Sequence, residues 1–176
     1  MPDDLLIADA HGDDPAEAIA DAVVAFLSDE QRQFSVQFVA ENPEDIAAAL
    51  YSEDLHGVRV LVSPQEDLEE DSDGKSTYCE YRLIVVVLAD ISGQSPYRRR
   101  MLNQLLHEIR VTLRGEPMGR GNDATGTPRD SATHVRTPIA TKFDPEGIDS
   151  GKYLGVLPVV YNAVESEGTL SEEALA

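Results

Sequence analysis

The sequence has a single cysteine and no long apolar run, and both shortages limit what the protein can be. Cys79 is the only cysteine among 176 residues, so no disulfide can form within the chain and nothing indicates an oxidising compartment. The longest apolar run, residues 83–89, is far too short to cross a bilayer. The first residues carry no positive charge ahead of an apolar stretch, which argues against a secretory signal. We therefore expect a protein that is made inside the cell and has no membrane contact.

Positive charge is also scarce. The 14 lysines and arginines face 33 aspartates and glutamates, so the formal net charge is 14 − 33 = −19. Because DNA is itself negatively charged, broad binding to the phosphate backbone is not expected. The length and the hydrophobic content of 41% suit one sizeable core. We predict a single domain over residues 14–163, with an acidic arm over residues 1–13 and an acidic tail over residues 164–176.

The spacing of apolar residues predicts an α+β fold, in which helices pack against a mixed, mainly antiparallel sheet. Asp14 followed by Pro15 is a typical helix start, and the same device recurs at Asn42 and Ser95. In the last predicted strand, Pro158 favours an edge position or a bulge. The predicted elements are helices starting at Asp14, Asn42 and Ser95, and strands over residues 33–40, 58–62, 78–89 and 153–162.

The strand over residues 78–89 is unusually long. At roughly 3.3 Å per residue it would reach about 40 Å, close to the full width of a compact domain of this size. Residues 83–88 are apolar on both faces, which is typical of a central strand that is covered on both sides. The acidic connection over residues 65–74 predicts a long central hairpin with a wide loop between this strand and the one before it. Strand length beyond the needs of the core is most useful where it meets another molecule.

The helix over residues 96–115 and the segment after it are predicted to differ sharply in order. The helix has an apolar stripe that includes Met101 and Leu102, and Gly115 fits the position just past its end. Residues 116–149 are rich in Gly, Thr, Pro and Asp and show no sustained periodicity. We expect an irregular excursion here, of the kind that is functional or becomes ordered on a partner.

The acidic connection contains two incomplete ligand motifs. Gly74-Lys75-Ser76 resembles the end of a phosphate-binding loop, but the first glycine of that motif would fall on Glu69. Residues 69–80 also imitate a calcium loop, although the flanking segments are predicted strands instead of helices. A solvated acidic hairpin tip is the favoured interpretation. The carboxylates that could contact a neighbouring subunit or a partner here are Glu69, Glu70, Asp71 and Asp73.

Other residue types give no pattern of catalysis or metal binding. The four histidines are scattered, without the spacing or the cysteine partners of a zinc site. No serine or cysteine has the sequence context of an activated nucleophile. Cys79 shares its face of the long strand with Tyr81 and Leu83, so we expect it to be buried as a small apolar residue. We predict no enzyme activity, no cofactor and no metal.

The three consecutive arginines Arg98, Arg99 and Arg100 break a local rule. They lie in the first turn of a predicted helix, where positive charge opposes the helix dipole at about 0.3–1 kcal/mol each. Conflicts of this kind tend to mark functional positions. Acidic residues of the same chain could screen the cluster, or the arginines could contact an acidic surface of a neighbouring subunit or partner.

The predicted order is helix, strand, short helix, strand, long strand, long helix, irregular excursion and strand. Three segments add detail to it: residues 57–64 (Gly-Val-Arg-Val-Leu-Val-Ser-Pro), 81–87 (Tyr-Arg-Leu-Ile-Val-Val-Val) and 154–161 (Leu-Gly-Val-Leu-Pro-Val-Val-Tyr). In this pattern, residues 15–163 resemble the tail terminator proteins of tailed bacteriophages, and related neck and tail-completion proteins share it. The chain departs from the pattern in its long excursion and its strongly acidic character.

The resemblance implies a small α+β subunit of a six-membered ring. Such a ring caps the finished tail tube, ends its polymerisation and offers a docking face for the head connector. The implied partners are other copies of the chain, the tail tube protein, the connector or stopper protein and, in a contractile tail, the sheath. Since the subunits are so acidic, DNA is expected to pass through the lumen without specific binding. The implied location is the neck of the virion, after assembly in the bacterial cytoplasm.

Two other functions stay open at this point. The first is another component of the neck, such as a connector or stopper between portal and tail. The second belongs to a different class, an acidic calcium-responsive binding module built on residues 69–80.

Overall fold

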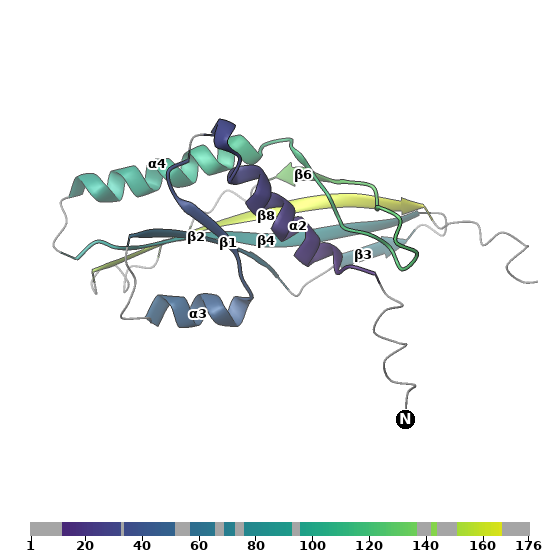
Figure 1. Ribbon diagram of the computed structural model, residues 1–176, viewed down its shortest axis with the longest axis horizontal. Helices are drawn as coiled ribbons and strands as arrows, with labels where there is room; N and C mark the ends of the chain where they lie inside the picture. Colours follow the sequence, from purple (N-terminus) through teal and green to yellow (C-terminus); the bar gives the residue numbers. More distant parts are fainter. Residues whose placement is uncertain are drawn as a thin grey trace, which may run out of the picture.

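The computed structural model describes residues 12–32, 34–51, 57–65, 69–72, 76–92, 96–136, 142–143 and 151–166. Their centre is an eight-stranded sheet with helices on both faces (Figure 1). Helices α2 (Pro15–Leu27) and α4 (Pro96–Leu113) cover one face, and α3 (Pro43–Tyr51) lies on the other. This arrangement confirms the predicted α+β class. None of the described helices combines the length and the apolar character needed to span a bilayer.

The sheet is mixed and mainly antiparallel, as predicted. Its strand order is β1-β2-β4-β8-β6-β5, with β3 pairing with β4 and β7 pairing with β8. Only β1 and β2 pair in parallel among the described strands. The strands are β1 (Gln37–Ala40), β2 (Val58–Pro64), β3 (Glu69–Ser72), β4 (Ser76–Asp90), β5 (Pro117–Met118), β6 (Ala132–Arg136), β7 (Lys142–Phe143) and β8 (Lys152–Ser166), and a short 3₁₀ helix covers Glu30–Arg32.

The longest pairing joins β4 to β8. Each strand has 15 residues, and the antiparallel register runs from Ser76 opposite Ser166 to Asp90 opposite Lys152. At about 3.3 Å per residue this two-stranded ribbon is roughly 46 Å long. The sequence predicts the length of β4 but not its partner, because the two strands are separated by α4 and by the whole excursion. β8 also continues into the segment assigned to the acidic tail.

The prediction of a wide loop over residues 65–74 is wrong in part. β2 pairs antiparallel with β4, which confirms the hairpin, but β3 then continues along β4 with Glu69 opposite Glu80. Residues 69–72 are acidic and lack apolar alternation, so their sequence resembles a loop. The backbone ladder offered by the long β4 extends the hairpin even though residues 69–72 have no apolar pattern of their own.

The prediction that the strand containing Pro158 lies at an edge of the sheet is also wrong. β8 is an inner strand, with β4 on one side and β6 and β7 on the other. Pro158 lies opposite Ile84 of β4. On the other side, β6 reaches Val160 and β7 reaches Val156, so no described residue pairs with Pro158 there. A proline that lacks a donor fits an inner strand at such a gap.

The core has two parts, one on each face of the sheet. On one face, odd-numbered residues of β4 pack against buried residues of α2 and α4. On the other face, Val86 and Leu88 of β4 pack against Leu61 of β2 and Ile46 of α3. This confirms that β4 is covered on both sides, and that Cys79 is buried. The prediction for Met101 is wrong, because its side chain is 55% exposed. The buried stripe of α4 runs through Leu102, Leu106, Ile109 and Leu113, and the residue before Leu102 points about 100° away from it.

Local signals set the ends of the helices. The Asp14 side chain accepts hydrogen bonds from the backbone N–H groups of Ala16 (2.8 Å) and Glu17 (3.1 Å), so it caps α2 as predicted. Gly115 follows α4 with a φ of 75°, a conformation that favours glycine.

The excursion after α4 is more ordered than predicted. Besides β5 and β6 it contains a turn in which Asp123 Oδ1 accepts three hydrogen bonds, from Thr125 N (2.8 Å), Thr125 Oγ1 (2.6 Å) and Thr127 N (3.0 Å). Asp13 links this loop to the start of α2, since its side chain accepts from Asn122 N (2.8 Å) and its carbonyl accepts from Arg129 Nη1 (2.8 Å). Side-chain bonds of this kind replace a periodic apolar pattern, which explains why the sequence suggested irregular structure.

Candidate functional site

The arginine cluster lies in the first turn of α4. Arg98 is half-buried, and Arg99 and Arg100 are exposed. None of the three forms an ion pair with a carboxylate in the described part of the chain. Arg99 acts on Tyr153, whose pKa is raised by burial and lowered in smaller part by the arginine. The dipole penalty of the cluster is therefore not offset by an ion pair with any described acidic residue.

The acidic candidates lie elsewhere. Glu69, Glu70 and Asp71 belong to β3 and stand opposite Glu80, Cys79 and Tyr78 of β4, while Asp73 lies outside the described residues. β3 pairs with the first residues of β4, whereas α4 follows its last residue, so the two candidate groups are at opposite ends of the ribbon (Figure 1). Residues 69–72 and 76–80 are paired strands, so this backbone does not wind into a calcium-binding loop.

A second acidic surface, which the sequence did not reveal, surrounds a hollow of about 260 Å³. We call it the acidic hollow, and its carboxylates are Glu17 and Asp21 from α2 and Glu41 from the end of β1. Glu41 is held in place because its N–H donates to the carbonyl of Val62 (2.9 Å). The other lining residues are Ala20, Ala40, Asn42 and Pro64.

The acidic hollow concentrates negative charge without compensation. None of its three carboxylates forms an ion pair with a cation in the residues that the structure describes. Glu17 and Asp21 are one helical turn apart, a like-charge spacing that costs an isolated helix about 0.2–0.5 kcal/mol. No set of three described His, Cys, Asp or Glu side chains is close enough to hold a metal ion. The hollow is therefore a negatively charged surface with no described cation paired to it.

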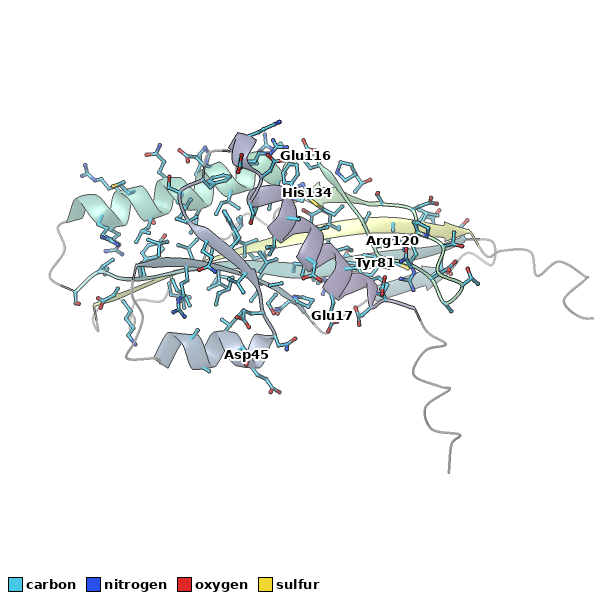
Figure 2. The ribbon with its side chains drawn as sticks, in the orientation of Figure 1. Glu17, Asp45, Tyr81, Glu116, Arg120 and His134 are labelled. Carbon is cyan, nitrogen blue, oxygen red and sulfur yellow. The ribbon has the colours of Figure 1, made fainter. Side chains whose placement is uncertain are left out.

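Two charged or titratable side chains outside these surfaces, Arg120 and His134, are buried and contact other side chains or the backbone. Arg120, only 2% exposed, donates from Nη1 to the Tyr81 hydroxyl (3.2 Å) and from Nε to the carbonyl of Asp130. Figure 2 shows Arg120 beside Tyr81. Burial raises the pKa of Tyr81, and the hydrogen bond from Arg120 lowers it in part. Nothing in the sequence indicates this contact, because a charged residue in a Gly-rich segment is normally exposed.

His134 occupies a similar buried position near the end of α4 (Figure 2). Its Nδ1 accepts from the backbone N–H of Gly115 (3.4 Å), and its ring packs edge-on against Tyr161 with a centroid distance of 5.5 Å. Burial lowers the pKa of His134, and the charge of Arg114 lowers it further. A neutral imidazole that accepts a backbone hydrogen bond at a helix end has a structural role.

Comparisons with known proteins do not identify a relative, since neither protein-family models nor curated proteins match the chain. The described residues present two exposed charged surfaces, the arginine cluster and the acidic hollow, and an extended ribbon.

Proposed function

We propose that the protein is a structural subunit of a bacteriophage virion, which forms a ring at the end of the tail tube, stops its polymerisation and joins it to the head connector. The observation that carries this proposal is the β4–β8 ribbon, which extends beyond the helices. At its far end Tyr78 is 49% exposed and its partner across the ladder, Val164, is 50% exposed.

The length of the ribbon explains why these side chains are uncovered. Tyr78 and Val164 lie on the same face of the sheet as Val86, which is the face that α3 covers. α3 has nine residues and so spans roughly 13 Å. Tyr78 lies eight residues from Val86 along β4, a separation of roughly 26 Å. The helix thus shields one end of the face and leaves the other end accessible to a neighbouring molecule.

Contact with a neighbour would stabilise this end of the ribbon. Full burial of a large apolar side chain contributes about 1.5–3 kcal/mol, so covering the exposed halves of Tyr78 and Val164 would contribute roughly 1.5–3 kcal/mol per subunit. The order of elements gives further support, because all those on which the resemblance to tail terminator proteins rests are present. Strand β1 adds an edge with a described partner on one side only, which is a surface for β-pairing between subunits.

Electron microscopy of virions labelled with an antibody against the chain tests the proposal. We expect label at the neck, where the tail meets the head. Disruption of the gene should yield tails of uncontrolled length that fail to join heads, because nothing would end tube growth. Label on the head shell or the tail fibres, or gene disruption that leaves tail length unchanged, would refute the proposed function.

A further inference from the structure

Helix α4 carries a positive surface on an otherwise acidic protein. Residues 96–114 contain five arginines and one glutamate, so their formal charge is 5 − 1 = +4, while the rest of the chain carries −19 − 4 = −23. Arg99, Arg100 and Arg114 are exposed, and so are the apolar side chains of Met101 (55%) and Val111 (51%). We call these side chains, together with the half-buried Arg98, the basic face of α4. It combines charge with apolar area, as protein interfaces do.

The acidic hollow complements the basic face in charge. Its three carboxylates lack an ion-pair partner among the described residues, as do the three arginines at the start of α4. Its volume of about 260 Å³ is several times the roughly 30 Å³ that a water molecule takes up in the liquid, so it has room for guanidinium groups.

The two surfaces cannot meet within one chain. Glu17 lies near the start of α2 and close to the centre of the molecule, as Figure 2 shows, whereas α4 begins at one end of the molecule, next to the last residues of β4 (Figure 1). Each molecule thus presents a cationic surface at one end and an anionic surface near its middle, where Pro64 of the hollow pairs with Leu83 halfway along β4. An interface between two different patches repeats from copy to copy and generates a ring where the rotation closes.

We propose that the basic face of α4 docks in the acidic hollow of a second copy of this chain, with Arg98, Arg99 and Arg100 opposite the carboxylates of Glu17, Asp21 and Glu41. The inference rests on the proposed ring in that it names the contact between its subunits. It also resolves the conflict at the start of α4, because the carboxylates of the neighbour supply the negative charge that the first turn of a helix prefers.

Charge reversal on each surface provides the test. One variant carries Arg98→Glu, Arg99→Glu and Arg100→Glu, and the other carries Glu17→Arg, Asp21→Arg and Glu41→Arg. Sedimentation velocity over a range of concentrations measures self-association of the purified protein. We expect the wild type to associate, and each variant alone to associate roughly tenfold to a hundredfold more weakly. Mixing the two variants should restore association, because every contact between unlike chains again joins opposite charges.

Two controls separate charge from folding. The variant with Arg98→Lys, Arg99→Lys and Arg100→Lys keeps the charge and should associate more like the wild type than like the Glu variant. Thermal unfolding should show that all variants fold: the Arg→Glu changes should raise the stability slightly, because negative charge at the start of α4 favours the helix dipole, and Glu17→Arg should lower it slightly for the same reason. No replaced side chain loses an ion pair with a described residue. A measurement on the wild type needs no variant: its association should weaken between about 0.1 and 1 M salt, where screening reaches contact distances.

Three results would overturn the proposal. The first is a wild type that stays monomeric at millimolar concentration. The second is a mixture of the two reversed variants that associates no better than either alone. The third is tight binding of duplex DNA that depends on the three arginines, which would make the basic face a nucleic-acid surface. If the charge swap works but the assemblies are open filaments and the label is absent from the virion neck, the contact stands and the proposed function fails. If the variants still form closed rings despite the charge changes, the proposed contact fails and the proposed ring stands.

Discussion

Three buried tyrosines allow a controlled test of what one unpaired hydroxyl costs this fold. Tyr161 and Tyr153 of β8 and Tyr81 of β4 are all buried. The hydroxyl of Tyr153 donates to Asn103 Oδ1 (2.8 Å), and that of Tyr81 accepts from Arg120 Nη1 (3.2 Å). The hydroxyl of Tyr161 has no hydrogen-bond partner among the described residues. The replacement Tyr→Phe therefore removes a satisfied group at two positions and an unsatisfied group at the third.

The expected changes have opposite signs. A buried polar group without a partner costs about 1–3 kcal/mol, so Tyr161→Phe should raise the free energy of unfolding by roughly 1–2 kcal/mol after the small loss of packing. Tyr153→Phe and Tyr81→Phe should lower it by about 0.5–1.5 kcal/mol, and Tyr81→Phe should cost more because it removes a partner from the buried Arg120. For a chain of this length, 1 kcal/mol corresponds to roughly 2–4 °C in the melting temperature.

Urea unfolding followed by circular dichroism measures these changes, with the midpoint and the slope fitted together. The loss of stability at alkaline pH provides a second measurement. Burial raises the pKa of Tyr161 and Tyr153 in the folded state, so their contribution is present below the unfolded value of about 10 and is lost as the pH rises above it. Tyr161→Phe should reduce this alkaline loss. If Tyr161→Phe destabilises the protein as much as Tyr153→Phe, its hydroxyl is satisfied and the reasoning is wrong.

Three further predictions concern single positions. Gly155→Ala should destabilise the fold by about 1–3 kcal/mol, because a Cβ there would meet Leu106 Cδ1 and lie 2.9 Å from the Tyr153 hydroxyl. Thermal unfolding measures this loss of stability, and an unchanged melting temperature would show that α4 can shift to make room. Asp14→Ala should cost about 0.5–2 kcal/mol through loss of the α2 cap, with Asp14→Asn as the control that retains most of the stability. The pKa of His134 is lowered in the folded state, so its contribution to stability should be complete above the unfolded pKa of about 6.5 and should fall as the pH drops below that value. His134→Asn should make the free energy of unfolding less dependent on pH in this range. An equally steep dependence in the variant would assign the effect to other groups.

The parts of the fold that depend on local chemistry could be predicted from the sequence. Asp14 with Pro15 marks the start of α2, and the apolar run within β4 marks a strand that is covered on both faces. The strands β3, β5, β6 and β7 could not be predicted, because they are short or polar and obtain their order from the long strands beside them. The same reason applies to the pairing of β4 with β8, which depends on contacts between distant segments.

The two charged surfaces also differ in whether they could be predicted from the sequence. The arginine cluster stands out because three like charges in one helical turn break a rule that can be checked within four residues. The acidic hollow does not, because Glu17, Asp21 and Glu41 come from two elements that meet only after folding. The spacing of Glu17 and Asp21 was a usable signal, since like charges one turn apart on a helix are unfavourable. Glu41 and the hollow itself required the packing of α2 across the end of β1.

The strong net charge of the chain is compatible with the proposed self-association because repulsion between whole molecules and attraction between paired groups act over different distances. A compact domain of this length has a diameter of roughly 40 Å, so the centres of two touching copies are about four Debye lengths apart at 0.1 M salt. Repulsion between net charges of −19 is therefore largely screened. Ion pairs between the basic face and the acidic hollow would act at about 4 Å, well within one Debye length. Moderate salt thus suppresses the repulsion first and leaves the proposed contact intact, so an acidic chain can associate with itself.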